Sequence, residues 1–178
     1  GPGRSHVVRD GVDKGCATSS FPTLRDYNRG PDSYLDLIDD ARRAVSMPII
    51  ASLNASTSAD WVQYAQRIAD AGADALELNL YFVPTDASLT GAQVETQYLD
   101  VIASIRQRVE LPLAIKIGPY FSSLPNFAHR AVEAGADGLV LFNRFLEPEI
   151  NLNERRVEPY LELSRPAELR LSLRWRIS

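Results

Sequence analysis

The chain has 178 residues, of which 45% are hydrophobic and 24% charged, enough for one compact domain with its own core. Its formal net charge of −4 argues against binding nucleic acid through a basic face. No apolar run reaches the roughly 18 residues that cross a bilayer, and residues 1–13 lack the apolar stretch of a signal peptide. We therefore expect a cytoplasmic protein that acts on a small-molecule substrate, with no nucleic-acid partner and no membrane span.

Residues 1–30 show no regular hydrophobic spacing, and their composition predicts a poorly structured N-terminal segment. From residue 31 to residue 178, helical and strand-like patterns alternate, which predicts a single barrel-type domain. The first half contains a helix over 33–45, a strand over 49–53, a helix capped by Thr57 or Ser58, a strand over 75–80 and a loop over 81–91. The second half contains a helix over 92–109, a strand over 111–117, a helix over 124–132, a strand over 138–142, and residues 157–163 as a fifth strand or an extended loop segment.

Two features recur at a nearly constant interval. The tetrapeptide AGAD at residues 71–74 returns at 134–137, and the strand-opening prolines Pro48 and Pro112 are 64 residues apart. Two strand–helix units of about 32 residues fit this interval, which favours an α/β fold of the TIM (β/α)8-barrel type. The main alternative is a doubly wound sheet, which usually carries a G-x-G-x-x-G loop that this sequence lacks.

The expected barrel is incomplete. A whole barrel of this type needs roughly 250 residues, so the chain is expected to supply about half to two-thirds of one. Either it is a fragment, or two chains complete each other. Exposed strand edges favour such association into a homo-oligomer.

Polar residues end four successive predicted strands: Asn54, Asn79, Lys116 and Asn143. Barrel chemistry takes place at the carboxyl ends of the strands, so these side chains are expected to point to one mouth. Lys116 stands out because the chain has 17 Arg but 2 Lys, and an ammonium performs tasks that a guanidinium does not. Structural interpretations remain open: a strand-end Asn often bonds turn backbone, and Lys116 could form an ion pair with Glu77 on the neighbouring strand.

A lysine with three carboxamides suits a flat ligand rich in carbonyl and N–H groups, because amides both donate and accept hydrogen bonds. A reduced flavin is such a ligand, since a nearby cation stabilises the negative charge near its pyrimidine ring. On the fourth strand, alternation groups Asn143 with Leu139 and Leu141. The two histidines, His6 and His129, are isolated, so no metal site is expected, and His129 is interpreted as a surface residue of a helix.

Four sequence runs carry a family resemblance: PIIASLN at 48–54, AGADALELN at 71–79, LAIKIGPYF at 113–121 and AGADGLVLFN at 134–143. In this order they resemble the dihydroorotate dehydrogenase family, and look closest to its bacterial "dihydroorotate dehydrogenase-like" branch, over roughly residues 21–175. The resemblance implies a barrel that binds flavin mononucleotide (FMN). It also implies an oxidoreductase that acts on the CH–CH bond of a dihydropyrimidine-like ring, in pyrimidine biosynthesis.

The resemblance also implies roles for individual residues. Lys116 and Asn79 match residues that contact the flavin, while Asn54, Asn79 and Asn143 match residues that contact the substrate. The catalytic base is unknown, because Phe82 stands where the family has Cys or Ser, and a phenyl ring cannot take a proton.

The missing base leaves several alternatives open. Tyr81, Thr85 or Ser88 of the same loop substitutes for the base, or the substrate differs, or the activity is lost. Two other functions also remain open: an aldolase-type enzyme that forms a Schiff base on Lys116, and a non-catalytic degenerate barrel. Because the family's glycine-rich phosphate loops follow later strands, this partial chain is expected to be inactive alone.

Overall fold

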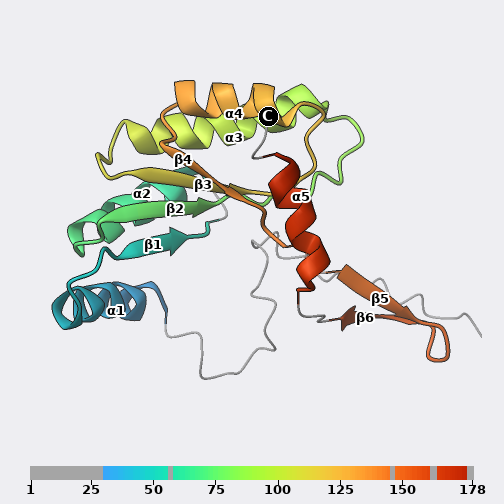
Figure 1. Cartoon of the computed structure of the whole chain (residues 1–178), viewed down its shortest axis with the longest axis horizontal. Coiled ribbons are helices and arrows are strands. Elements are labelled where there is room, and N and C mark those ends of the chain that lie inside the picture. The colour runs from blue at the N-terminus through green and yellow to red at the C-terminus, as the bar shows by residue number, and fades with distance from the viewer. Residues whose placement is uncertain (1–29, 56–57, 145–146, 161–163, 176–178) are drawn as a thin grey trace, which may run out of the picture.

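Four parallel strands and the helices between them form the main body of the molecule (Figure 1). The computed structural model describes residues 30–55, 58–144, 147–160 and 164–175, and the statements below concern these residues. The elements of the main body are α1 (Gly30–Ala44), β1 (Ile50–Leu53), α2 (Ser58–Asp70), β2 (Ala75–Asn79), α3 (Gly91–Arg106), β3 (Leu113–Ile117), α4 (Leu124–Glu133) and β4 (Gly138–Leu141). The eight helices and strands predicted between residues 33 and 142 are therefore confirmed, with ends that differ by a few residues.

The strands lie in sequence order, β1-β2-β3-β4, and every neighbouring pair is parallel. Right-handed crossovers that always step in the same direction place their helices on one face of a sheet. A doubly wound sheet instead reverses its strand order and carries helices on both faces. The fold is therefore a partial TIM (β/α)8-type barrel, in which this chain contributes four consecutive parallel strands.

The two faces of the sheet differ in burial because side chains alternate along each strand. The face covered by helices is the core, where Leu76 and Ile115 are 0% exposed. In Figure 1, α3 and α4 lie along this side of the sheet. On the opposite face, which faces the axis in a barrel, Ile50 is 63% exposed, and Glu77 and Lys116 are half-buried. Buried and more exposed residues therefore alternate along each of the first three strands.

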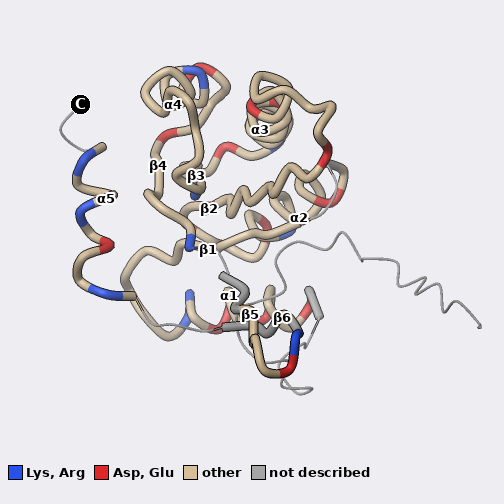
Figure 2. Tube along the Cα trace, turned by 90° about the vertical axis from the view of Figure 1, so that its right-hand side faces the viewer, with Lys and Arg blue, Asp and Glu red and all other residues tan. Residues whose placement is uncertain are grey.

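Charged residues gather on the helices and loops of the main body (Figure 2). The four strands of the sheet carry two charged residues, Glu77 on β2 and Lys116 on β3, and both lie on the open face. A charge is costly to bury unless it is paired or meets a ligand. The open face, where these two charges lie, is therefore the part of the sheet where a ligand site is expected.

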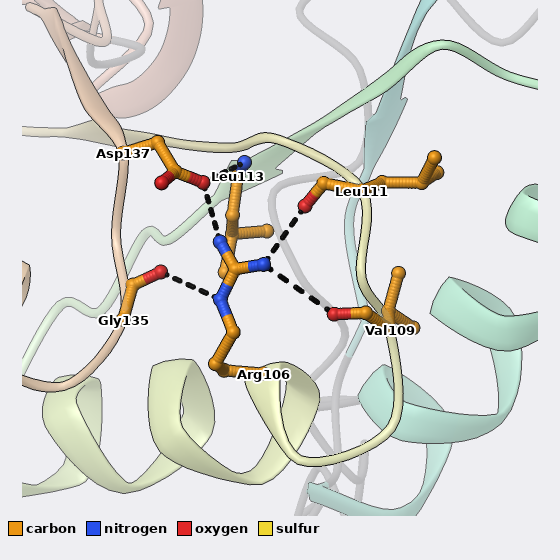
Figure 3. A network of polar contacts seen from close by, with 6 residues as sticks. All are labelled: Arg106, Val109, Leu111, Leu113, Gly135 and Asp137. Atoms are coloured by element: carbon orange, nitrogen blue, oxygen red, sulfur yellow. Dashed lines mark hydrogen bonds and ion pairs between the residues drawn. The ribbon is translucent and has the colours of Figure 1, made fainter.

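An arginine network closes the amino-terminal end of β3 (Figure 3). Arg106, the last residue of α3, donates hydrogen bonds to the carbonyl oxygens of Gly135 at 2.9 Å and Leu111 at 3.0 Å. It also forms an ion pair with Asp137. The Oδ2 of Asp137 accepts a further bond of 2.8 Å from the N–H of Leu113, where β3 begins. The network thus ties a helix end, a strand start and the following turn together.

The same arrangement occurs at β1. Arg42 of α1 donates to Oδ2 of Asp74 at 2.7 Å, and this oxygen accepts a bond of 2.8 Å from the N–H of Ile49. Arg42 and Arg106 are 64 positions apart. The interval seen in the sequence therefore corresponds to a structural repeat, in which α1-β1-α2-β2 is followed by the equivalent α3-β3-α4-β4.

The chain leaves the parallel sheet after β4. Strands β5 (Glu147–Asn151) and β6 (Arg156–Tyr160) form an antiparallel hairpin apart from the main sheet, followed by the 3-10 helix η1 (Pro166–Glu168) and by α5 (Leu169–Arg174) (Figure 1). The prediction of a fifth barrel strand over 157–163 is therefore wrong, because residues 157–160 pair with the adjacent β5 and not with the main sheet. Residues 161–163 lie outside the described residues. The N-terminal segment predicted over 1–30 also lies outside them, except for Gly30, which begins α1.

Candidate functional site

Two carboxamides meet at the carboxyl end of the sheet. Asn79 is the last residue of β2, and Asn143 follows β4, where its N–H donates to the carbonyl of Ile117 at 2.7 Å. The Nδ2 of Asn143 donates a hydrogen bond of 2.7 Å to the Oδ1 of Asn79. Within the described residues, the Nδ2 of Asn79 and the Oδ1 of Asn143 have no partner. The pair therefore offers both a donor and an acceptor to a ligand.

The position of Asn143 corrects one prediction. Alternation along the fourth strand grouped it with Leu139 and Leu141, which pack against the core. However, β4 ends at Leu141, so alternation no longer constrains the next residues. The side chain of Asn143 consequently meets Asn79, whose side chain belongs to the open face.

Lys116 lies beside this pair of amides. Its Cα is the register partner of Asn79 on the neighbouring strand, and both side chains lie on the open face. The Nζ of Lys116 lies 3.7 Å from the Oε1 of Glu77, which is an ion-pair distance but longer than a hydrogen bond. Among the described residues, the ammonium has no hydrogen-bond acceptor, so its three N–H groups remain available to a ligand.

Glu77 connects Lys116 with the first strand. The Oγ of Ser52, the register partner of Glu77, donates to the same Oε1 at 3.0 Å. Tyr34 of α1 supports Ser52 in turn: its hydroxyl donates to the carbonyl oxygen of Ser52 at 3.0 Å and accepts from its N–H at 2.9 Å. A continuous series of contacts therefore runs from α1 through β1 and β2 to Lys116.

Asn54 stands apart from this group. It directly follows β1, its side chain is exposed, and it forms no hydrogen bond with Asn79, Lys116 or Asn143. The structure thus brings together three of the four predicted strand-end residues and leaves Asn54 at the edge strand.

An aromatic cluster holds the loop that follows β2. The ring of Phe82 meets Tyr98 edge-on, with 4.8 Å between ring centroids. Phe121 and Phe127 stack at 4.3 Å, and both adjoin Tyr98. The Tyr98 hydroxyl accepts a bond of 3.1 Å from the backbone N–H of Phe82, and burial raises the pKa of Tyr98. The ring of Phe82 therefore packs against the core, where it is partly buried.

The three loop residues considered as substitutes for the base have different surroundings. The Oγ of Ser88 donates to the Oδ1 of Asp86 at 2.7 Å, so this hydroxyl serves its own turn. Thr85 is exposed, and Tyr81 is half-buried. The geometry gives none of them a bond to Asn79 or Lys116 that would mark it as the base.

One of the two isolated histidines lies among the described residues. His129 is a 75% exposed residue of α4 that lies 3.5 Å from Glu133, in agreement with its interpretation as a surface residue. His6 lies outside the described residues. Within the part of the chain that the structure describes, no group of three His, Cys, Asp or Glu residues is placed to hold a metal ion. The helices in this part are all too short or too polar to cross a membrane.

Sequence reasoning missed part of the network around Lys116. The ion pair between Glu77 and Lys116 was considered, and the structure places the two groups 3.7 Å apart. Ser52 was not considered, although alternation along its strand places it on the same face. The contact between Tyr34 and Ser52 depends on how α1 packs beside β1, for which the sequence offers no local signal. The bond from the backbone N–H of Phe82 to the hydroxyl of Tyr98 likewise depends on tertiary packing.

Known proteins similar to this chain are dihydroorotate dehydrogenases, although no family model matches it. The chain is 32% identical over 110 residues to "Putative dihydroorotate dehydrogenase A (fumarate)" of Aeropyrum pernix. This alignment covers 60% of this chain and 35% of that protein. It is 25% identical over 130 residues to "Dihydroorotate dehydrogenase B (NAD(+)), catalytic subunit" of Alkaliphilus metalliredigens, which covers 72% of this chain and 43% of that protein. The chain thus matches less than half of the length of these relatives.

Similarity to solved structures is lower. One solved structure is described as a "putative dihydrodipicolinate synthetase" from Pseudomonas aeruginosa, and its sequence is 19% identical to this chain. The superposition has a TM-score of 0.48 and includes 64% of this chain and 38% of that protein. The barrel-type fold is instead established by the strand order and by the placement of the helices. The sequence likeness to dihydroorotate dehydrogenases is the comparison that bears on function.

Proposed function

We propose that this chain forms part of an FMN-dependent oxidoreductase of the dihydroorotate dehydrogenase-like type. The proposed substrate is a dihydropyrimidine-like ring, on which the enzyme acts at a CH–CH bond. The observation that carries the proposal is the open ammonium of Lys116 beside the hydrogen-bonded amides of Asn79 and Asn143. The likeness to dihydroorotate dehydrogenases supports it independently.

The residues at this rim fit the pyrimidine edge of a flavin. That edge alternates carbonyl and N–H groups, and Asn79 with Asn143 supplies both kinds of partner. A bound flavin supplies hydride chemistry, and its reduced form gains negative charge near the pyrimidine ring. Lys116 would stabilise that charge with N–H groups that have no acceptor among the described residues.

The asparagines would then orient the substrate. Asn79 and Asn143 brace each other, which reduces the freedom that each amide loses when it binds a ring. Asn54, at the exposed end of β1, would contact the substrate from the neighbouring strand. Phe82 supplies no group that takes a proton, and its ring lies against Tyr98, so we assign no base to this position.

Flavin binding by the protein at its natural length tests the proposal. FMN fluorescence is titrated against the wild-type protein, Lys116→Met and the control Arg43→Met, which removes an exposed cation of α1. We expect the wild type to bind FMN and Lys116→Met to bind it about tenfold more weakly or worse, since a bond to a charged group contributes about 1.5–3 kcal/mol. Arg43→Met should bind like the wild type.

Two results would contradict the proposal. A wild-type protein that takes up no FMN lacks the cofactor site. Covalent trapping of a ketone or aldehyde on Lys116 by borohydride would instead favour the Schiff-base function, in which the lysine attacks a carbonyl as a free amine.

A further inference from the structure

The carboxylate of Glu77 lies directly below the rim formed by Asn79, Lys116 and Asn143. A single oxygen, Oε1, accepts the hydroxyl bond of Ser52 at 3.0 Å and lies 3.7 Å from the Nζ of Lys116. The side chain of Glu77 is 19% exposed and that of Lys116 is 31% exposed. These are the two charges of the four-stranded sheet, and they neutralise each other on its open face.

This contact contributes little to holding the strands together. Ladders of backbone hydrogen bonds already join β1 to β2 and β2 to β3. An ion pair at 3.7 Å without a hydrogen bond adds little stability, and an apolar pair would suit a sheet face at least as well. The arrangement is better explained by what it does to the ammonium.

We propose that Glu77 is a positioning residue that holds the ammonium of Lys116 at the level of Asn79 and moderates its positive charge. This inference rests on the proposed flavin site and adds to it a residue that sets how strongly the site favours the reduced, negatively charged flavin. Ser52 fixes the carboxylate from the other side, and the Tyr34 hydroxyl fixes Ser52. The position of the Lys116 ammonium is thereby fixed through Glu77 and Ser52 to α1, so that its charge does not move freely with the side chain.

Glu77→Gln separates the two contacts of this oxygen. The amide of Gln still accepts the bond from Ser52, but its neutral oxygen attracts the ammonium much more weakly than the carboxylate does. Ser52→Ala does the converse, because it removes the hydroxyl and keeps the carboxylate. Glu133→Gln is the matched control, since Glu133 is a 65% exposed carboxylate of α4 beside His129.

The first measurement needs no flavin. Lys14 and Lys116 are the two lysines of this chain. Reductive ¹³C-methylation labels every lysine and the terminal amine, and the variants Lys14→Arg and Lys116→Arg assign the two lysine signals in an NMR spectrum. We expect the Lys116 signal to move in Glu77→Gln, to move less in the same direction in Ser52→Ala, and to stay unchanged in Glu133→Gln. The Lys14 signal should stay in place throughout.

The second measurement is the reduction potential of bound FMN. Glu77→Gln should raise it, because the unopposed cation favours the reduced form, with a change of about tenfold in the ratio of the two dissociation constants. Lys116→Met should lower it. Opposite signs distinguish an electrostatic role from loss of structure, which would weaken both forms alike.

The outcomes separate the two proposals. A protein that binds no FMN but shows the expected NMR shifts disproves the flavin site while the Glu77–Lys116 coupling stands. An unmoved Lys116 signal in a folded Glu77→Gln protein, or an unchanged potential, overturns the role of Glu77. If Glu77→Gln does not fold, an unmoved signal in Ser52→Ala has the same meaning.

Discussion

The Nδ2 of Asn143 donates a 2.7 Å hydrogen bond to the Oδ1 of Asn79, although β3 lies between β2, which Asn79 ends, and β4, which Asn143 follows. The bond joins the end of β4 to the end of β2. It also orients both amides, since each side chain fixes the rotation of the other. The pair is therefore a structural link between two strand ends, at the rim where the proposed ligand would bind.

A double-mutant cycle on this pair should show coupling. We expect Asn79→Ala and Asn143→Ala each to destabilise the protein, and the double variant to lose about 1 kcal/mol less than the sum of the two. Urea unfolding monitored by circular dichroism measures all four proteins. Strictly additive losses would show that the bond contributes nothing in solution.

The arginine networks around Arg106 and Arg42 should differ in how much they stabilise the folded protein. Arg106 bonds Asp137 and the carbonyl oxygens of Gly135 and Leu111, and 29% of its side chain is exposed. Arg42 bonds Asp74, and 48% of its side chain is exposed. Arg106→Met should therefore cost about 2–3 kcal/mol of unfolding free energy, because the guanidinium loses its bonds to Asp137 and to the carbonyl oxygens of Gly135, Leu111 and Val109. Arg42→Met should cost about 1 kcal/mol or less. Equal losses in urea unfolding would contradict this ranking.

The two glycines of the repeat provide a second matched comparison. Gly72 has φ +90° and Gly135 has φ +113°, so alanine is strained at both positions. A Cβ at Gly135 would lie 2.7 Å from the Cγ of Arg106, whereas at Gly72 the nearest atom is 3.9 Å away. We expect Gly72→Ala to lower the free energy of unfolding by about 1–2 kcal/mol and Gly135→Ala to lower it clearly more. In Gly135→Ala the side chain of Arg106 must move, which breaks its hydrogen bonds. Thermal unfolding of both variants measures the difference.

Much of the fold was predictable because each strand and helix has a local signal. Leu76 and Leu78 alternate with Glu77 and Asn79, and this period of two places the leucines in the core. The recurring AGAD motif marks the turns whose aspartates, Asp74 and Asp137, accept bonds from strand starts. The hairpin after β4 was not predicted, although Asn151 and Asn153 are turn-forming residues and the Oδ1 of Asn151 accepts bonds from the N–H groups of Asn153 and Glu154.

The candidate site was predictable to a lesser degree. The register that places Asn79 beside Lys116 follows from parallel pairing. The bond to Asn143 does not, because Asn143 lies beyond the end of β4, where alternation no longer applies. The support of Ser52 by Tyr34 requires the packing of α1, which is a tertiary property.

Tyr98 should control the order of the loop after β2. Tyr98→Phe keeps the ring contacts with Phe82, Phe121 and Phe127 but removes the acceptor of the Phe82 N–H. The orphaned N–H should cost about 1–3 kcal/mol or become hydrated through local opening. Hydrogen exchange at the Phe82 amide should accelerate about tenfold or more, while the amides of β3 stay protected. Unchanged exchange at Phe82 would show that its N–H does not depend on this hydroxyl.

Acid should weaken the protein through Asp137. The N–H of Leu113, and to a lesser extent Arg106, hold the pKa of this carboxyl below its ordinary value of 3.8. A lowered pKa in the folded state means that the unfolded state binds the proton more readily. The resulting stability is therefore present above pH 3.8 and is lost as the pH falls through the folded value.

Urea unfolding between about pH 6 and about pH 2.5 measures this effect. The free energy of unfolding should fall in the wild type as the pH drops below 3.8, and Asp137→Asn should show a flatter profile in that range. Arg106→Met should retain part of the slope, because the bond from Leu113, the larger cause, remains. A slope that disappears entirely in Arg106→Met would instead make the guanidinium the dominant partner of this carboxylate.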